Sequence, residues 1–343
     1  MPNFEVVAPC EKNGIPIIYS CTNGFAPYVS VAIQSLINHI SDLHFYDIII
    51  LERGINEEFK KLILAQANNR KNISIRFINI SKIVETFDHS SLELSLPFET
   101  YFGIIAPFIL KEYKKIICIN VDTLVRSDVA ELFYENLDNQ TIGGVVDIFI
   151  NGAFELNYKM GVLSGKTMPE YFNQVLKKIN HNRYINGGLL TIDCVQYRAK
   201  ETITSLIEIA KKEKFVFCDQ DVVNILFKDD ITLLDPKWNT AVITNSRSQI
   251  LCDSSTQRVH DAYCNSCKNP SLLHWGGKPK PWICPDVPFG SEWWQTAVQT
   301  PFIGHIIARM VDGLITRKEY YKQRYGQAVA AWEPVPKNII RPI

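Results

Sequence analysis

The sequence lacks an excess of charge, a long apolar run and a repeated unit. Its 36 Lys and Arg side chains balance 36 Asp and Glu side chains, so no overall field attracts nucleic acid or an anionic membrane. No segment stays apolar long enough to cross a bilayer, and residues 1–11 lack the basic stretch and apolar run of a secretory signal. We therefore expect a cytoplasmic protein without a nucleic-acid partner. Its 343 residues suffice for one large domain with an extension.

The nine cysteines divide into two groups. Cys21, Cys118 and Cys194 lie in apolar runs and are expected to be small buried thiols of a reducing compartment. The second group lies in the last third of the chain and consists of Cys252, Cys264, Cys267 and Cys284. Four thiolates with a C-x-x-C pair are typical of a structural zinc site. The unequal outer spacing leaves free thiols as the alternative.

The first half alternates short β-branched runs with helical patterns, which predicts an α/β fold with a parallel sheet covered by helices. Strands are expected at residues 15–20, 45–51, 73–78, 115–119 and 142–146, and helices at residues 26–38, 56–68 and 100–110. The first strand runs into Thr22, Asn23 and Gly24, at the end of the strand where open α/β sheets bind ligands. This turn lacks the G-x-G-x-x-G sequence of a dinucleotide-dependent dehydrogenase, which argues against that class.

Two later strands also end on polar side chains. The first leads into Asn120, Val121 and Asp122, and the second leads into Asp147. Oxygen atoms delivered into a loop in this way are suited to hold a divalent cation against phosphate. An ordinary Asx turn after a strand is the alternative.

Further polar groups follow in the middle of the chain. Residues 186–188, Asn-Gly-Gly, precede an apolar run at 189–192, which places a carboxamide and flexible backbone beside a buried strand, with a simple turn into that strand as the alternative. Asp219 and Gln220 open a helical pattern that reaches Phe227. Asp219 is either the cap of this helix or a polar group of the site, and the two roles are compatible.

Two regions are candidates for contacts with other molecules. Residues 149–182 have a variable pattern, which favours a loop and helix that cover the site and contact an acceptor. A tail helix is expected from Phe302 to Lys318, and it packs on its own domain or on a partner, or lies on a membrane near a lipid-linked acceptor. We therefore divide the chain into a catalytic domain at residues 1–284 and a helical extension at residues 285–343.

The stretch from His274 to Trp282 reads HWGGKPKPW. Glycines let the backbone approach an anion, lysines neutralise phosphate charge, and a neutral imidazole can bind a divalent metal. This combination suggests a pyrophosphate site. A Trp- and Pro-rich surface loop is the alternative.

Together these motifs resemble glycosyltransferase family 8, especially its bacterial lipopolysaccharide galactosyl- and glucosyltransferases. The block at residues 114–133, KKIICINVDTLVRSDVAELF, is similar to the family's strand, D-x-D loop and following helix. The terminal H-x-x-G-x-x-K-P-W motif of the family is matched by His274, Gly277, Lys280, Pro281 and Trp282. The family's donor-sugar contacts fall on Asp147, Asn186, Gly188, Asp219 and Gln220.

The resemblance implies a GT-A type fold, which is a Rossmann-like mixed sheet flanked by helices, here with a C-terminal helical extension. It implies retaining transfer of a hexose from a UDP-sugar to a hydroxyl of a glycan acceptor, such as lipopolysaccharide or capsule. Mn²⁺ or Mg²⁺ would be bound by Asp122 and His274, with Asn120 as a further oxygen ligand. The metal and Lys280 would then stabilise the charge on the departing diphosphate.

The other implied roles concern the donor and the chemistry. Donor contacts would come from Thr22, Asn23, Asn120, Val121, Asp147, Asn186, Gly188, Gly277 and Lys280. The catalytic groups would be Gln220 and Asp219, together with Lys280. Because the amide of Gln220 is a poor nucleophile, we expect the acceptor to attack on the face from which the diphosphate leaves.

Three positions depart from the family pattern, and all three lie on the nucleotide side. Asn120 replaces the first acid of the D-x-D motif, and Gly103 replaces the arginine of the Y-x-R motif. The pair Thr22 and Asn23 replaces two acids after the first strand. Two functions stay open: an active transferase with altered donor or metal dependence, and an inactive relative that binds nucleotide or carbohydrate as a partner of another glycosyltransferase.

Overall fold

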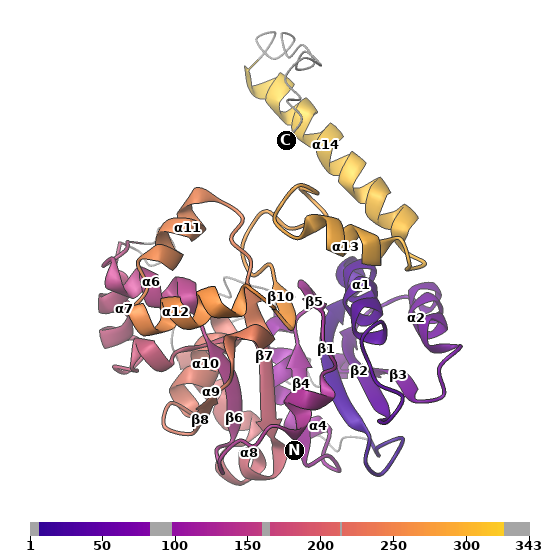
Figure 1. Cartoon of the computed structure of the whole chain (residues 1–343), viewed down its shortest axis with the longest axis horizontal. Helices are drawn as coiled ribbons and strands as arrows, with labels where there is room; N and C mark the ends of the chain where they lie inside the picture. Colours follow the sequence, from indigo (N-terminus) through magenta and orange to yellow (C-terminus); the bar gives the residue numbers. More distant parts are fainter. Residues whose placement is uncertain (1–6, 83–97, 160–164, 213–214, 326–343) are drawn as a thin grey trace.

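The computed structural model describes residues 7–82, 98–159, 165–212 and 215–325 (Figure 1). Within these residues a seven-stranded sheet has the order β3-β2-β1-β4-β7-β6-β8. Strands β3, β2, β1 and β4 are parallel, whereas β7 is antiparallel to both β4 and β6. The strands are β1 (Ile15–Thr22), β2 (Tyr46–Arg53), β3 (Ile73–Asn79), β4 (Lys115–Ile119), β6 (Ile142–Val146), β7 (Ile185–Asp193) and β8 (Ile231–Leu233). The predicted α/β mixed sheet is therefore confirmed.

The sheet is buried on both faces because its side chains alternate between two apolar cores. In β1, Ile17 and Tyr19 pack in the core that includes α1, whereas Ile18 points into the core that includes α4. The helices in the first half of the chain are α1 (Ala26–Ile37), α2 (Glu57–Leu64), α4 (Phe102–Ile109) and α5 (Ala130–Tyr134). Because β1 and β4 are parallel neighbours in this covered sheet, their carboxyl ends lie side by side at the same end of the sheet.

The second half is more helical than the sequence pattern suggested. Its helices are α6 (Ile148–Glu155), α7 (Met168–Gln174), α8 (Cys194–Lys200), α9 (Ile203–Lys212), α10 (Cys218–Leu226), α11 (Ser246–Asp253) and α12 (Gln257–Ser266). The segment at residues 149–182, predicted as a loop and helix, contains α7 and most of α6 joined by irregular chain, and its part at residues 160–164 lies outside the described residues. Asp147 caps α6 with hydrogen bonds to two backbone N–H groups, and Thr167 forms a capping box at α7.

The alternative of a turn at residues 186–188 is wrong, because these residues lie inside β7. A side-chain carbon at Gly187 would lie 3.3 Å from Cβ of Gln220, and one at Gly188 would lie 2.1 Å from Cε1 of His274. The two glycines therefore let α10 and the imidazole pack directly on the strand.

A small second sheet joins distant parts of the chain, in the order β5-β10-β9. It consists of β5 (Thr123–Val125), β9 (Thr240–Ala241) and β10 (Leu272–His274). Strand β10 is antiparallel to β5 and places His274 opposite Thr123. This pairing brings the terminal motif beside the loop that follows β4.

The C-terminal helices α13 (Gly290–Ala297) and α14 (Ile303–Tyr325) contact α1. Helix α14 is longer than the predicted segment and projects away from the sheet (Figure 1). Its first turn is anchored by the buried side chains of Phe302 and Ile306, whereas Ile307, Val311 and Leu314 are exposed. Among the described helices, none is both long and apolar enough to span a bilayer.

Candidate functional site

A cavity of about 1020 Å³ lies at the carboxyl ends of β1 and β4 and extends toward α6 and α12. It brings together most of the residues that the sequence singled out. They are Thr22, Asn120, Val121, Asp122, Asp147, Asn186, Gly188, Asp219, Gln220, His274, Gly277 and Lys280. Cavities of this size accommodate small-molecule ligands.

Two predicted nucleotide-side positions lie elsewhere. Asn23 does not line the cavity, because its Oδ1 accepts a hydrogen bond from the backbone N–H of Asn56, 3.1 Å away, before α2. Gly103 lies in α4, where an added side-chain carbon would meet Cys118 at 3.8 Å. Thr22, in contrast, lines the cavity.

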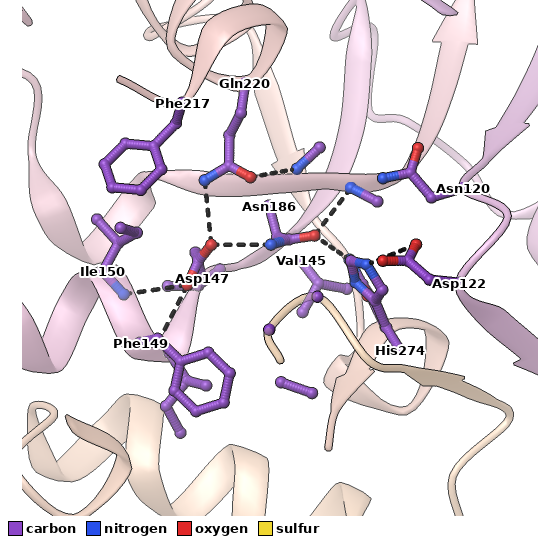
Figure 2. A pocket seen from close by; sticks show the side chains of 18 of the residues that line it. Asn120, Asp122, Val145, Asp147, Phe149, Ile150, Asn186, Phe217, Gln220 and His274 are labelled. Atoms are coloured by element: carbon purple, nitrogen blue, oxygen red, sulfur yellow. Dashed lines mark hydrogen bonds and ion pairs between the residues drawn. The ribbon is translucent and has the colours of Figure 1, made fainter. Parts of the chain in front are cut away.

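Asp122 is the centre of a charged cluster at the cavity wall. Its Oδ1 lies 3.4 Å from Nε2 of His274 (Figure 2), and its Oδ2 accepts a hydrogen bond from Nζ of Lys280 at 2.5 Å. The Lys280 ammonium also donates to the backbone oxygen of Trp275. Burial alone would raise the pKa of the Asp122 carboxyl, but Lys280 and His274 outweigh burial and hold this pKa well below its usual range.

The backbone explains why Asp122 and His274 meet. The pairing of β5 with β10 is extended by a hydrogen bond from the N–H of Trp275 to the oxygen of Asp122, at 3.0 Å. The imidazole then rests on Gly188, which has no side chain to displace it. The pairing of β5 with β10 and the absence of a side chain at Gly188 therefore fix the position of the imidazole.

Asn239 also holds the imidazole, and the sequence analysis missed it. Its Oδ1 lies 2.9 Å from Nδ1 of His274, and its Nδ2 donates to Oδ1 of Asn186 at 3.0 Å. Asn239 ends the short 3-10 helix Pro236–Asn239 and is buried. The only local signal was the turn sequence DPKWN, which indicates a turn and gives no role to the asparagine.

Opposite this cluster, three polar side chains form a hydrogen-bonded group. The carboxylate oxygen Oδ2 of Asp147 accepts from Nδ2 of Asn186 at 2.8 Å and from Nε2 of Gln220 at 3.0 Å. The Gln220 carbonyl accepts from the backbone N–H of Gly187 at 2.8 Å. Figure 2 shows the three side chains pointing toward one another, with Asp147 at the start of α6, Asn186 in β7 and Gln220 in α10.

The two acids that flank Gln220 have different environments. Asp219 lines the cavity, and burial raises its pKa to about 7. Asp221 is fully buried and accepts hydrogen bonds from the hydroxyls of Tyr171 at 2.7 Å and Tyr184 at 2.5 Å. Burial raises the pKa of Asp221 to about 6. Asp221 therefore ties α10 to α7 and β7, whereas Asp219 faces the ligand space.

The structure does not assemble the four-cysteine zinc site that the sequence suggested. Cys284 donates from Sγ to Oδ1 of Asp286 at 2.8 Å, and Cys252 is buried in a small apolar cluster between α11 and α12. Within the described part of the chain, the group of three or more His, Cys, Asp or Glu side chains with ligand atoms within 4.8 Å of one another is Cys252, Asp253 and His260.

Residues 16–284 match the model of glycosyl transferase family 8. The chain belongs to this family. It is 24% identical over 280 residues to General stress protein A of Bacillus subtilis, which covers 79% of this chain and 89% of that protein. It is 25% identical over 268 residues to glycosyltransferase GlyF of Streptococcus pneumoniae, covering 78% of this chain and 56% of that protein. With Lipopolysaccharide 1,2-glucosyltransferase of Escherichia coli it shares 23% identity over 277 residues, or 78% and 72% of the two chains.

Solved structures agree with this family at the level of the fold. The bifunctional glycosyltransferase WbbM superposes with a TM-score of 0.80 at 23% identity, over 89% of this chain and 53% of that chain. The galactosyltransferase LgtC, in a complex with donor and acceptor sugar analogs, superposes with a TM-score of 0.65 at 19% identity, over 84% and 96% of the two chains. The expected GT-A fold is therefore confirmed. The chain spans just over half of GlyF and of WbbM.

Proposed function

We propose that this family 8 glycosyltransferase is an active, retaining hexosyltransferase that takes its sugar from a UDP-sugar and transfers it to a hydroxyl of a glycan acceptor, such as lipopolysaccharide or capsule. The observation that supports activity is the position of the Asp122 carboxylate opposite Nε2 of His274, 3.4 Å apart at the cavity wall. The pairing of β5 with β10 brings these two side chains together from distant parts of the sequence.

The residues present fit a divalent cation. A carboxylate oxygen of Asp122 and an imidazole nitrogen of His274 suit Mn²⁺ or Mg²⁺, and Asn120 adds an amide oxygen at the end of β4. A cation bound there would neutralise charge on the diphosphate of a sugar nucleotide. Lys280 supplies a second positive charge beside the same carboxylate, so this chain can hold an anionic leaving group from two directions.

The opposite side of the cavity is suited to hold the sugar. Asp147 and Asn186 form a fixed set of hydrogen-bonding groups, and Gln220 is held against both Asp147 and Gly187. Fixed donors and acceptors orient a hexose and its anomeric carbon. An amide is a poor nucleophile, so we propose same-face attack by the acceptor, with the leaving phosphate oxygen taking the acceptor's proton.

A titration of UDP in a calorimeter, with and without Mn²⁺, tests the metal and nucleotide parts of this proposal. We expect heat of binding only when Mn²⁺ is present, followed by slow release of UDP when a turnover-competent UDP-sugar is supplied without acceptor. Failure to bind under either condition would contradict the proposal. Binding without any release of UDP from a panel of UDP-sugars would favour the second candidate, an inactive relative that binds nucleotide or carbohydrate, which the Asn120 and Gly103 departures also suit.

We propose further that residues 285–343 form an extension that holds the transferase domain, residues 1–284, near its acceptor. The supporting observation is the exposure of Val311 and Leu314 on the projecting α14. Flotation with anionic lipid vesicles tests a peripheral membrane contact. The double change Val311→Ser and Leu314→Ser should reduce flotation without changing UDP affinity, and unchanged flotation would remove α14 from that role.

A further inference from the structure

We propose that Asn239 is a positioning residue that keeps the proton of His274 on Nδ1 and so leaves Nε2 as the atom that binds metal. The inference rests on the proposed function for its consequence, since a metal must bind for Nε2 to matter. Its structural basis is a chain of hydrogen bonds that starts at Asp147, crosses the cavity wall through Asn186 and Asn239, and ends at the imidazole of His274.

Asp147 determines which group donates and which accepts in every hydrogen bond of this chain, because a carboxylate can only accept. Its Oδ1 accepts from the backbone N–H groups of Phe149 and Ile150, each at 3.0 Å. Its Oδ2 accepts from Gln220 and from Asn186 at 2.8 Å. Asn186 must therefore turn its NH₂ group toward Asp147 and its carbonyl oxygen away from it.

The direction passes on through Asn186 to Asn239. The Asn186 carbonyl accepts from the backbone N–H of Gly188 at 2.8 Å and from Nδ2 of Asn239 at 3.0 Å. Asn239 thus uses its NH₂ group on Asn186 and presents only its carbonyl oxygen to His274. This oxygen is 2.9 Å from Nδ1, and since it has no hydrogen, the imidazole must donate.

A neutral imidazole carries one ring proton, so a proton on Nδ1 leaves a lone pair on Nε2. That atom faces the Asp122 carboxylate at 3.4 Å, where a hydrogen bond would favour the opposite tautomer. Asn239 and His274 are each 5% exposed, so water has little access to take the place of the Asn239 carbonyl as the acceptor at Nδ1. Asn239 therefore opposes Asp122 and keeps the ligand nitrogen free.

The tautomer can be read directly in the metal-free protein by long-range ¹H–¹⁵N correlation spectroscopy at a pH where the imidazole is neutral. The signals of His274 are identified by their loss in His274→Ala. We expect Nδ1–H in the wild type. Asn239→Leu, which removes both hydrogen bonds, should shift His274 to Nε2–H, and Asn239→Asp should restore Nδ1–H because a carboxylate accepts from that atom. Mn²⁺ affinity measured by calorimetry should fall by about 10- to 100-fold in Asn239→Leu.

Asn151→Leu is the matched control, because Asn151 is also fully buried and its amide bonds to Asn182 and Thr256, away from the cavity wall. It should lower thermal stability and leave both the tautomer and Mn²⁺ affinity unchanged. Retention of Nδ1–H in Asn239→Leu would overturn the inference. If that variant does not fold, Asn239→Ala carries the same expectation. A wild type that binds no Mn²⁺ would contradict the proposed function alone, since the tautomer is measured without metal.

Discussion

The two sides of the cavity differ in how their polar groups are satisfied. On the sugar side, defined by Asp147, Asn186 and Gln220, each side chain bonds to another member of the group or to the strand beneath it. On the metal side, defined by Asn120, Asp122 and Lys280, the two charged groups pair, and the side chain of Asn120 makes no hydrogen bond to any residue that the structure describes. The sugar side is therefore joined throughout by hydrogen bonds, whereas on the metal side the Asn120 side chain stands apart from the Asp122–Lys280 pair.

This difference accounts for one departure from the family pattern, Asn120 in place of an acid. A change within a connected group leaves partners unsatisfied, which costs about 1–3 kcal/mol for each buried group. A change at Asn120 leaves no such partner, because its side chain is exposed and makes no hydrogen bond to the residues that the structure describes. Sequence variation is thus less costly on the metal side, provided that Asp122 and His274 stay in place.

The largest effect is expected for Asp122→Ala. The change removes the carboxylate opposite Nε2 of His274 and leaves the Lys280 ammonium without its counter-charge. Loss of a metal ligand costs several kcal/mol of transition-state stabilisation, so UDP-sugar turnover should fall by about 10³-fold or more. Asp193→Ala, which removes a helix cap outside the cavity, should lower stability by about 1 kcal/mol and leave turnover intact. Activity of Asp122→Ala within tenfold of the wild type would show that the metal side is not needed.

Gly188→Ala should have the next largest effect, because Gly188 lies between the sugar side and the metal side of the cavity. The new methyl group would lie 2.1 Å from Cε1 of His274, so the imidazole or the strand must move, which costs about 1–3 kcal/mol. We expect a lower melting temperature and weaker Mn²⁺-dependent UDP binding. Gly304→Ala, where an added carbon meets nothing within 4 Å, is the control and should change neither quantity. Normal UDP binding in Gly188→Ala would mean that the site tolerates a displaced imidazole.

How far the sequence predicted this site depends on whether the signal was local. Asp122 and His274 each stood in a recognisable local pattern, a buried strand that ends in polar residues and a glycine- and lysine-rich loop. Asn239 stood in none, because its contact with His274 depends on the pairing of β9 with β10. The turn alternative at Asn186 rested on local preference, since Asn-Gly-Gly favours a turn, whereas pairing of the residues on both sides of it with β4 and β6 keeps the segment in one strand.

The carboxyl of Asp219 gives a smaller, pH-dependent effect. Burial raises its pKa from 3.8 to about 7, so between about pH 4 and pH 7 the folded protein holds a proton that the unfolded chain has released. Stability must therefore fall as pH rises through this interval. Asp221 acts in the same direction, so Asp219→Asn should reduce this fall without abolishing it. The decrease in stability is measured as the difference between the midpoints of urea unfolding at pH 5 and pH 8, with Asp229→Asn, a change at an exposed side chain, as the control. An unchanged fall in Asp219→Asn would place its pKa near the usual value.

The smallest effect is expected for Asn120→Asp, which restores the acid of the family motif. Asn120 is exposed at the end of β4 beside Asp122, so a carboxylate there adds attraction for a cation without breaking any hydrogen bond. Higher ligand charge tightens binding of hard cations, and Mn²⁺ affinity in calorimetry should rise by about tenfold. Asn269→Asp adds the same charge at an exposed position outside the cavity and should leave affinity unchanged. Equal affinities of Asn120→Asp and the wild type would show that Asn120 does not face the ion, and Asp122 and His274 would then hold it without this residue.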